Sequence, residues 1–130
     1  MPSKFSNKRH VAFKKQSGLC YYCGSPMWES KPKEFANKHK ITRKYAARFQ
    51  CTAEHLLARC DGGKDQKSNI AAACLFCNST RHQRKSPPAP LKYKTHIQKR
   101  LKKGKWHPKK LRHLVSPMIS KPALIVSIEG

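Results

Sequence analysis

The sequence predicts a small α+β domain with a ββα unit at its centre and helical extensions around it. Three observations lead to this prediction. Two short strand-like segments, one ending at Glu54-His55 and one covering 70–73, are separated by a Gly62-Gly63 turn, and a helical segment follows from about Asn78. Four of the six cysteines form two Cys-x-x-Cys pairs, one on each side of these strands. The length of 130 residues allows one modest domain and excludes a large multidomain enzyme.

The two cysteine pairs are Cys20-Tyr-Tyr-Cys23 and Cys74-Leu-Phe-Cys77. Two residues between thiolates suit a knuckle turn that offers both sulfur atoms to one tetrahedral Zn²⁺. The N-terminus is basic and has no apolar signal-peptide segment, so we expect a reducing, cytoplasmic compartment in which disulfides do not persist. Disulfides and redox chemistry are the alternatives to a structural zinc site. Cys51 and Cys60 lie outside the pairs and are expected to be small buried residues.

The charge of the chain points to a polyanionic partner. The 29 Lys and Arg residues against 6 Asp and Glu residues give a formal net charge of +23. Such a charge favours nucleic acid over an acidic membrane or protein, and no stretch approaches the roughly 20 apolar residues of a membrane-spanning helix. We expect DNA as the partner, with RNA as the alternative. Residues 51–85 hold three of the six acidic residues, which suits chemistry that needs carboxylates.

Charge and proline content divide the chain into three parts. A basic N-terminal arm covers 1–16, a central zinc-stapled domain covers 17–85, and a Pro-rich linker with a basic extension covers 86–130. Within the central domain, Ile41, Tyr45 and Phe49 follow one another at four-residue spacing among basic residues, which predicts an inserted amphipathic helix at about 33–49. The charges of this helix either contact DNA or are simply solvated.

The C-terminal extension is expected to contain two short helices and a strand. The first helix covers 91–103 and ends before Gly104. The second begins at Pro108 and stops before Ser116-Pro117. The β-branched run over 123–128 predicts an edge strand.

The most informative pattern lies around Glu54-His55. Asn69 follows His55 by fourteen residues, and Asn78 comes directly after Cys77. His82 follows Asn78 by one helical turn and therefore lies on the same face of the helix. The two strands and the helix would converge on these side chains.

This arrangement resembles the HNH endonucleases, the ββα-metal nuclease family, in their zinc-stapled form with two Cys-x-x-Cys pairs. The resemblance rests on the acid–His dipeptide, the Gly-Gly, the asparagine fourteen residues after the histidine, and the knuckle followed at once by Asn. It covers about residues 17–85 and implies a metal-dependent DNA endonuclease that hydrolyses phosphodiester bonds. In two positions the chain departs from the commoner family pattern: Glu54 stands in place of Asp, and Asn78 stands in place of His.

The resemblance implies a role for each residue. His55 corresponds to the general base that takes a proton from the attacking water, and Asn69 holds the loop that orients it. Glu54, Asn78 and His82 correspond to ligands of a catalytic cation, and an amide oxygen favours Mg²⁺ or Mn²⁺. The structural alternatives are a helix cap for Asn78, a turn residue for Asn69, and a solvated residue or phosphate contact for His82.

Basic residues within and around the pattern are expected to contact nucleic acid. They are Lys40, Arg43, Lys44, Arg59, Arg81, Arg84, Lys102 and Lys103. The main alternative to an endonuclease is a non-catalytic, zinc-containing DNA- or RNA-binding protein, in which Glu54-His55 has no chemical role. An RNA-directed nuclease on the same scaffold is a further alternative.

Overall fold

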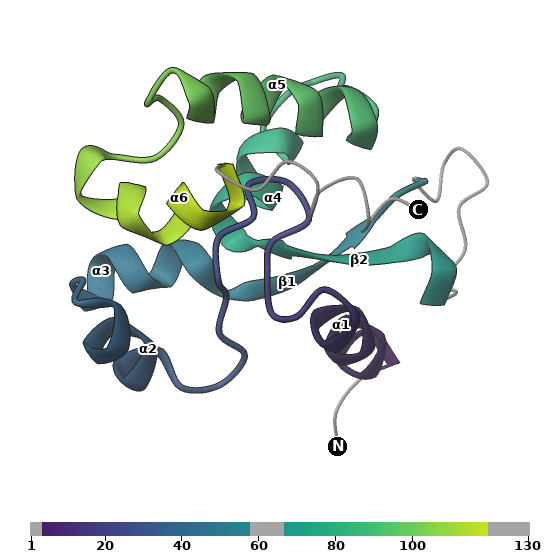
Figure 1. Cartoon of the computed structure of the whole chain (residues 1–130). Coiled ribbons are helices and arrows are strands. Elements are labelled where there is room, and N and C mark those ends of the chain that lie inside the picture. Colours follow the sequence, from purple (N-terminus) through teal and green to yellow (C-terminus); the bar gives the residue numbers. More distant parts are fainter. Residues whose placement is uncertain (1–3, 58–66, 120–130) are drawn as a thin grey trace.

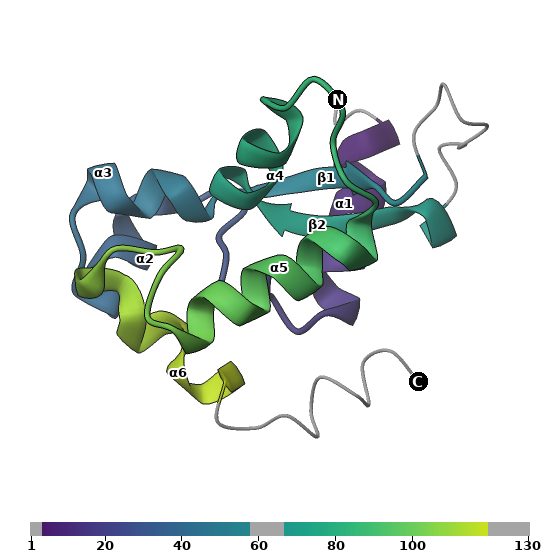
Figure 2. The same cartoon turned by 90° about the horizontal axis from the view of Figure 1, so that it is seen from above.

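The computed structural model describes residues 4–57 and 67–119. Its elements in chain order are α1 (Lys4–Lys15), α2 (Pro32–His39), α3 (Arg43–Ala46), η1 (Ala47–Phe49), β1 (Cys51–His55), η3 (Lys67–Asn69), β2 (Ile70–Cys74), α4 (Leu75–His82), α5 (Pro90–Lys102), η4 (Lys109–Leu111) and α6 (Arg112–Ile119). The two strands lie between α1 on one face and α4 and α5 on the other, and α2, α3 and α6 gather beyond one end of the sheet (Figures 1 and 2). The predicted α+β class is confirmed.

β1 and β2 form an antiparallel pair whose register runs from Cys51 opposite Cys74 to His55 opposite Ile70. Both strands lie where the sequence predicts them. Every residue of β2 is buried, because helices cover both faces of this strand. Its outer edge is satisfied by Gln16, whose side-chain amide donates to the carbonyl of Ala72 at 2.8 Å and accepts from the N–H of Ala72 at 3.0 Å. The N-terminal arm therefore contributes a helix, α1, and an edge-capping side chain to the core.

The single helix predicted at about 33–49 is wrong. The chain forms α2, breaks at Lys40 and restarts as α3 and η1. Lys40 adopts a left-handed conformation with φ of 56°, and Thr42 caps α3 by accepting a hydrogen bond from the N–H of Tyr45 at 3.1 Å. The apolar stripe is retained, since Phe49 is fully buried and Ile41 packs against the core.

The C-terminal extension shares one hydrophobic core with the central residues. α5 begins one residue before the predicted helix, and Gly104 follows it with φ of 71°. Buried side chains from this region are Tyr93, Ile97, Leu101, Leu111, Leu114 and Val115. α6 continues through Pro117 to Ile119, so the prediction that it stops before Ser116-Pro117 is wrong. The predicted strand over 123–128 lies outside the described residues.

Candidate functional site

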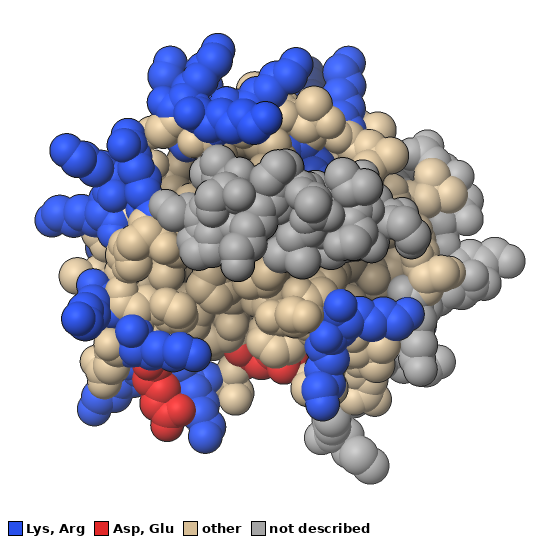
Figure 3. Space-filling view, in the orientation of Figure 1, with Lys and Arg blue, Asp and Glu red and all other residues tan. Residues whose placement is uncertain are grey.

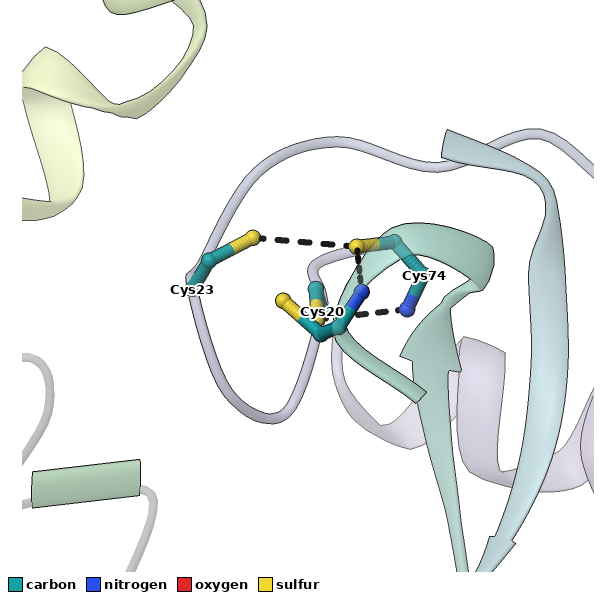
Figure 4. A group of neighbouring side chains, drawn as sticks. Cys20, Cys23 and Cys74 are labelled. Carbon is teal, nitrogen blue, oxygen red and sulfur yellow. Dashed lines mark hydrogen bonds between the residues drawn. The ribbon is translucent and has the colours of Figure 1, made fainter. Parts of the chain in front are cut away.

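Four cysteine side chains converge in the core. Cys20, Cys23, Cys74 and Cys77 are all buried, and their sulfur atoms lie within 4.8 Å of one another. Figure 4 shows Cys20, Cys23 and Cys74 of this group. In a tetrahedral site with Zn–S bonds of about 2.3 Å, sulfur atoms are about 3.8 Å apart. The Sγ atoms of Cys23 and Cys74 are 4.0 Å apart. The cluster therefore fits a zinc ion, as the spacing of the two pairs predicts.

Hydrogen-bond donors surround the cysteine sulfurs, as thiolate ligands require. The N–H of Cys74 donates to Cys20 Sγ at 3.2 Å, and the N–H of Tyr22 donates to the same atom at 3.4 Å. The indole N–H of Trp106 donates to Cys77 Sγ at 3.4 Å. The C-terminal extension thus supplies a direct contact to this cluster.

The cysteine thiols of the cluster differ in acidity. Burial raises the pKa of Cys74 and that of Cys77 well above the ordinary thiol value. Burial acts in the same direction on Cys23, but hydrogen bonds with the other three cysteines outweigh it and bring the pKa of Cys23 well below that value. A bound Zn²⁺ would require all four as thiolates.

Glu54 lies at the centre of a buried polar network at the end of β1, and only 2 % of its surface is exposed. Its Oε2 accepts hydrogen bonds from the Tyr22 hydroxyl at 2.9 Å and from Arg81 Nη1 at 3.2 Å. Its Oε1 lies 3.0 Å from Nε2 of His82. Burial and the neighbouring Glu54 carboxylate raise the pKa of Tyr22, so its hydroxyl stays protonated and donates. The two carboxylate oxygens therefore have separate sets of partners.

Asn78 and His82 lie one turn apart on α4, beside Glu54. The Asn78 Nδ2 donates to Thr52 Oγ1 at 3.0 Å and to the carbonyl of Ala53 at 3.2 Å. Both amide hydrogens are thereby used, which leaves Oδ1 as the atom that could hold a cation. Neighbouring ligands of an octahedral Mg²⁺ lie about 3.0 Å apart, given metal–oxygen distances of about 2.1 Å. The hydrogen bond of 3.0 Å between Glu54 Oε1 and His82 Nε2 holds these two atoms at a separation that two ligands of one such cation could also have.

Asn69 fixes the segment that follows β1. Its side-chain Oδ1 accepts from the N–H of Leu57 at 2.8 Å, and its Nδ2 donates to the carbonyl of Leu57 at 3.0 Å. The N–H of Leu56 donates to the carbonyl of Asn69 at 2.9 Å. These bonds constrain the two residues directly after His55, which is partly exposed at the end of β1.

The model of the HNH endonuclease family matches residues 20–84, half of the chain. This chain belongs to the HNH endonuclease family. No curated protein and no solved structure matches it significantly. Membership places the chain among proteins that act on or bind nucleic acids, and the matched range contains both cysteine pairs and every residue of the Glu54 network.

Most of the basic residues predicted to contact nucleic acid are exposed in this HNH protein. They are Lys40, Arg43, Lys44, Arg84, Lys102 and Lys103. Basic side chains dominate the periphery of the face in Figure 3, and acidic ones are few there. Arg59 lies outside the described residues. Arg81 is buried, and its guanidinium donates to Glu54 and to the carbonyl of Pro88, at 2.8 Å from Nη2 and 3.0 Å from Nε. Arg81 is therefore bound within the HNH core and is not exposed for the predicted contact with nucleic acid.

Sequence reasoning missed two residues that contact these sites. Tyr22 enters the sequence pattern only as a spacer within the first cysteine pair, although a buried tyrosine needs a hydrogen-bond partner for its hydroxyl. Trp106 donates its indole N–H to Cys77 Sγ, and this contact depends on the fold of the extension and not on a local sequence pattern. Within the described residues, no helix has the length and apolar character needed to cross a membrane.

Proposed function

We propose that this HNH protein is a metal-dependent DNA endonuclease in which His55 is the general base. The approach of His82 Nε2 to Glu54 Oε1 at 3.0 Å carries the proposal, because it joins two expected cation ligands that are 28 residues apart in the chain. The four cysteines hold a structural Zn²⁺, and Glu54, Asn78 and His82 hold Mg²⁺ or Mn²⁺.

The chemistry attributed to the chain's own residues is limited and specific. A ring nitrogen of neutral His55 takes a proton from the water that attacks the scissile phosphorus. Asn69 keeps the following segment in place through Leu57, which restricts the orientation of His55. A divalent cation bound at the Glu54 site would neutralise charge on the phosphate and stabilise the leaving oxygen. Exposed Lys and Arg residues supply affinity through the phosphate backbone.

The test is cleavage of supercoiled plasmid by the wild type and by His55→Ala at low salt, with Mg²⁺, Mn²⁺ or EDTA. Loss of a general base typically lowers the rate by about 10²–10⁴-fold. DNA affinity and zinc content should stay unchanged in the variant. His96→Ala is the matched control, because His96 is an exposed histidine on α5 outside the Glu54 network.

Three other outcomes would change the assignment. If both proteins bind DNA equally and neither cuts DNA or RNA with any metal, the chain is a non-catalytic binding module. Cleavage of structured RNA in preference to duplex DNA would identify an RNA-directed nuclease instead. If His55→Ala cleaves DNA at the wild-type rate, His55 is not the general base.

A further inference from the structure

The two oxygens of Glu54 are held unequally. Oε2 accepts hydrogen bonds from one uncharged donor, the Tyr22 hydroxyl at 2.9 Å, and from one charged donor, the Arg81 guanidinium at 3.2 Å. Oε1 faces His82 instead. A carboxylate that was free to rotate could present either oxygen, or both together, to a cation. These two donors remove that freedom.

Tyr22 is itself immobilised by the zinc knuckle and by the extension. It is fully buried, its N–H donates to Cys20 Sγ, and its carbonyl accepts from Nε2 of Gln98 at 2.7 Å. Its ring makes an edge contact with that of Tyr93, with 4.9 Å between centroids. The hydroxyl therefore occupies a position set by the cysteine cluster and cannot follow Glu54 if the carboxylate moves.

Arg81 is immobilised by a different segment of the chain. It projects from α4, and its Nε and Nη2 both donate to the carbonyl of Pro88. Its Nη1 donates to Glu54 Oε2 and also lies 3.3 Å from Nε2 of His82. The guanidinium fork thus joins the Pro-rich segment to the carboxylate. Lys could not reproduce this, because an ammonium group is a single charged point without a planar fork.

We infer that Tyr22 and Arg81 are positioning residues that hold Oε2 of Glu54, so that Glu54 binds the divalent cation through Oε1 alone. The inference deepens the proposed function and rests on its assignment of Glu54 as a cation ligand. One-oxygen binding suits Mg²⁺ and Mn²⁺, which take octahedral surroundings, whereas Ca²⁺ readily accepts both oxygens of a carboxylate. The pair of donors thereby selects for the smaller ions, and the zinc knuckle takes part in that selection through Tyr22.

The experiment is a titration of the full-length, zinc-loaded protein with Mn²⁺, followed by electron paramagnetic resonance, and with Ca²⁺ by calorimetry. Tyr22→Phe keeps the ring and removes the hydroxyl. Loss of a residue that orients a metal ligand typically weakens binding by about 10–100-fold, so we expect a loss of about tenfold or more for Mn²⁺ and a smaller loss for Ca²⁺. Arg81→Lys should change the preference between the two ions in the same direction.

Tyr93→Phe is the matched control. Tyr93 is as buried as Tyr22, but its hydroxyl donates to the carbonyl of Cys77 at 2.8 Å and not to Glu54. The inference is overturned if Tyr22→Phe binds Mn²⁺ as the wild type does, if Tyr93→Phe loses as much, or if the wild type binds no Mn²⁺. Zinc content and circular dichroism identify a variant that has failed to fold, and Arg81→Lys then decides the question.

The same titrations separate this inference from the proposed function. If the wild type cuts DNA with Mn²⁺ and Tyr22→Phe keeps full affinity for Mn²⁺, the positioning role is refuted and the nuclease assignment stands. If the wild type binds Mn²⁺ tightly, Tyr22→Phe binds it weakly and neither protein cuts DNA, the positioning role is supported and the proposed nuclease activity is refuted.

Discussion

Replacing Arg81 by Met should destabilise the protein strongly, because the change leaves the Glu54 carboxylate buried without the positively charged guanidinium group that pairs with it. The two side chains are 9 % and 2 % exposed, and Arg81 Nη1 lies 3.2 Å from Oε2 of Glu54. At that distance and an effective dielectric constant of about 20, Coulomb's law gives about 5 kcal/mol. Measured losses on breaking a buried pair are about 3–5 kcal/mol. We therefore expect Arg81→Met to lower the free energy of unfolding by about 3–5 kcal/mol.

The assay is urea unfolding followed by circular dichroism at a fixed, saturating concentration of zinc. With a slope of about 1–3 kcal/mol per molar urea, the midpoint should fall by at least about 1 M. Arg84→Met is the control, because Arg84 is exposed and its loss should change stability by less than about 0.5 kcal/mol. The double variant Arg81→Met with Glu54→Gln removes both charges and should recover part of the loss. A single variant within about 1 kcal/mol of the wild type, or a double variant no more stable than the single one, refutes this reasoning.

Three further perturbations test the zinc cluster, the extension and the buried thiol of Cys51. Removing zinc with a strong chelator should unfold the protein, and near-native circular dichroism after complete zinc loss would contradict this. Ile97→Ala, at a fully buried position of α5, should cost about 2–5 kcal/mol in urea unfolding, whereas a loss below 1 kcal/mol would argue against a core that includes the extension. Burial raises the pKa of Cys51 to about 12, so peptide mapping should find Cys51 unmodified by iodoacetamide at pH 8 until the protein unfolds, and rapid modification of the folded form would exclude the buried thiol.

The features that the sequence predicts well are those set by local chemistry. Cysteine spacing determines which thiols can share one metal, and the cluster of Cys20, Cys23, Cys74 and Cys77 follows from it. The strands β1 and β2 were predicted correctly because the residue pattern of each strand is local. The four-residue spacing of Ile97 and Leu101 likewise agrees with the buried face of α5, to which Tyr93 also belongs.

The features that the sequence did not predict depend on partners far away in the chain. Arginine is a common phosphate-binding residue, so the sequence favours that role for Arg81. Its contacts with Glu54 and Pro88, which bury it, depend on the tertiary structure. The apolar stripe continues across Lys40 and therefore gives no sign that the helix breaks there. Thr42 caps the helix that follows the break, but one threonine among many polar residues is a weak signal. The role of the extension depends on tertiary contacts that charge patterning cannot indicate.

The cysteine cluster and the Glu54 site are connected through both cysteine pairs. The second pair opens α4, in which Cys74 caps the helix and Asn78 follows Cys77 directly. The first pair encloses Tyr22, whose hydroxyl binds Glu54. Each cysteine pair is therefore adjacent in sequence to a residue of the proposed catalytic site, Tyr22 within the first pair and Asn78 after the second. A two-stranded sheet offers few other ways to hold such a site rigidly, because most of its stability must come from the zinc cluster and the surrounding helices. Substitution of any of the four cysteines should then abolish zinc binding, folding and Mn²⁺ binding together, whereas His55→Ala should remove the chemistry alone.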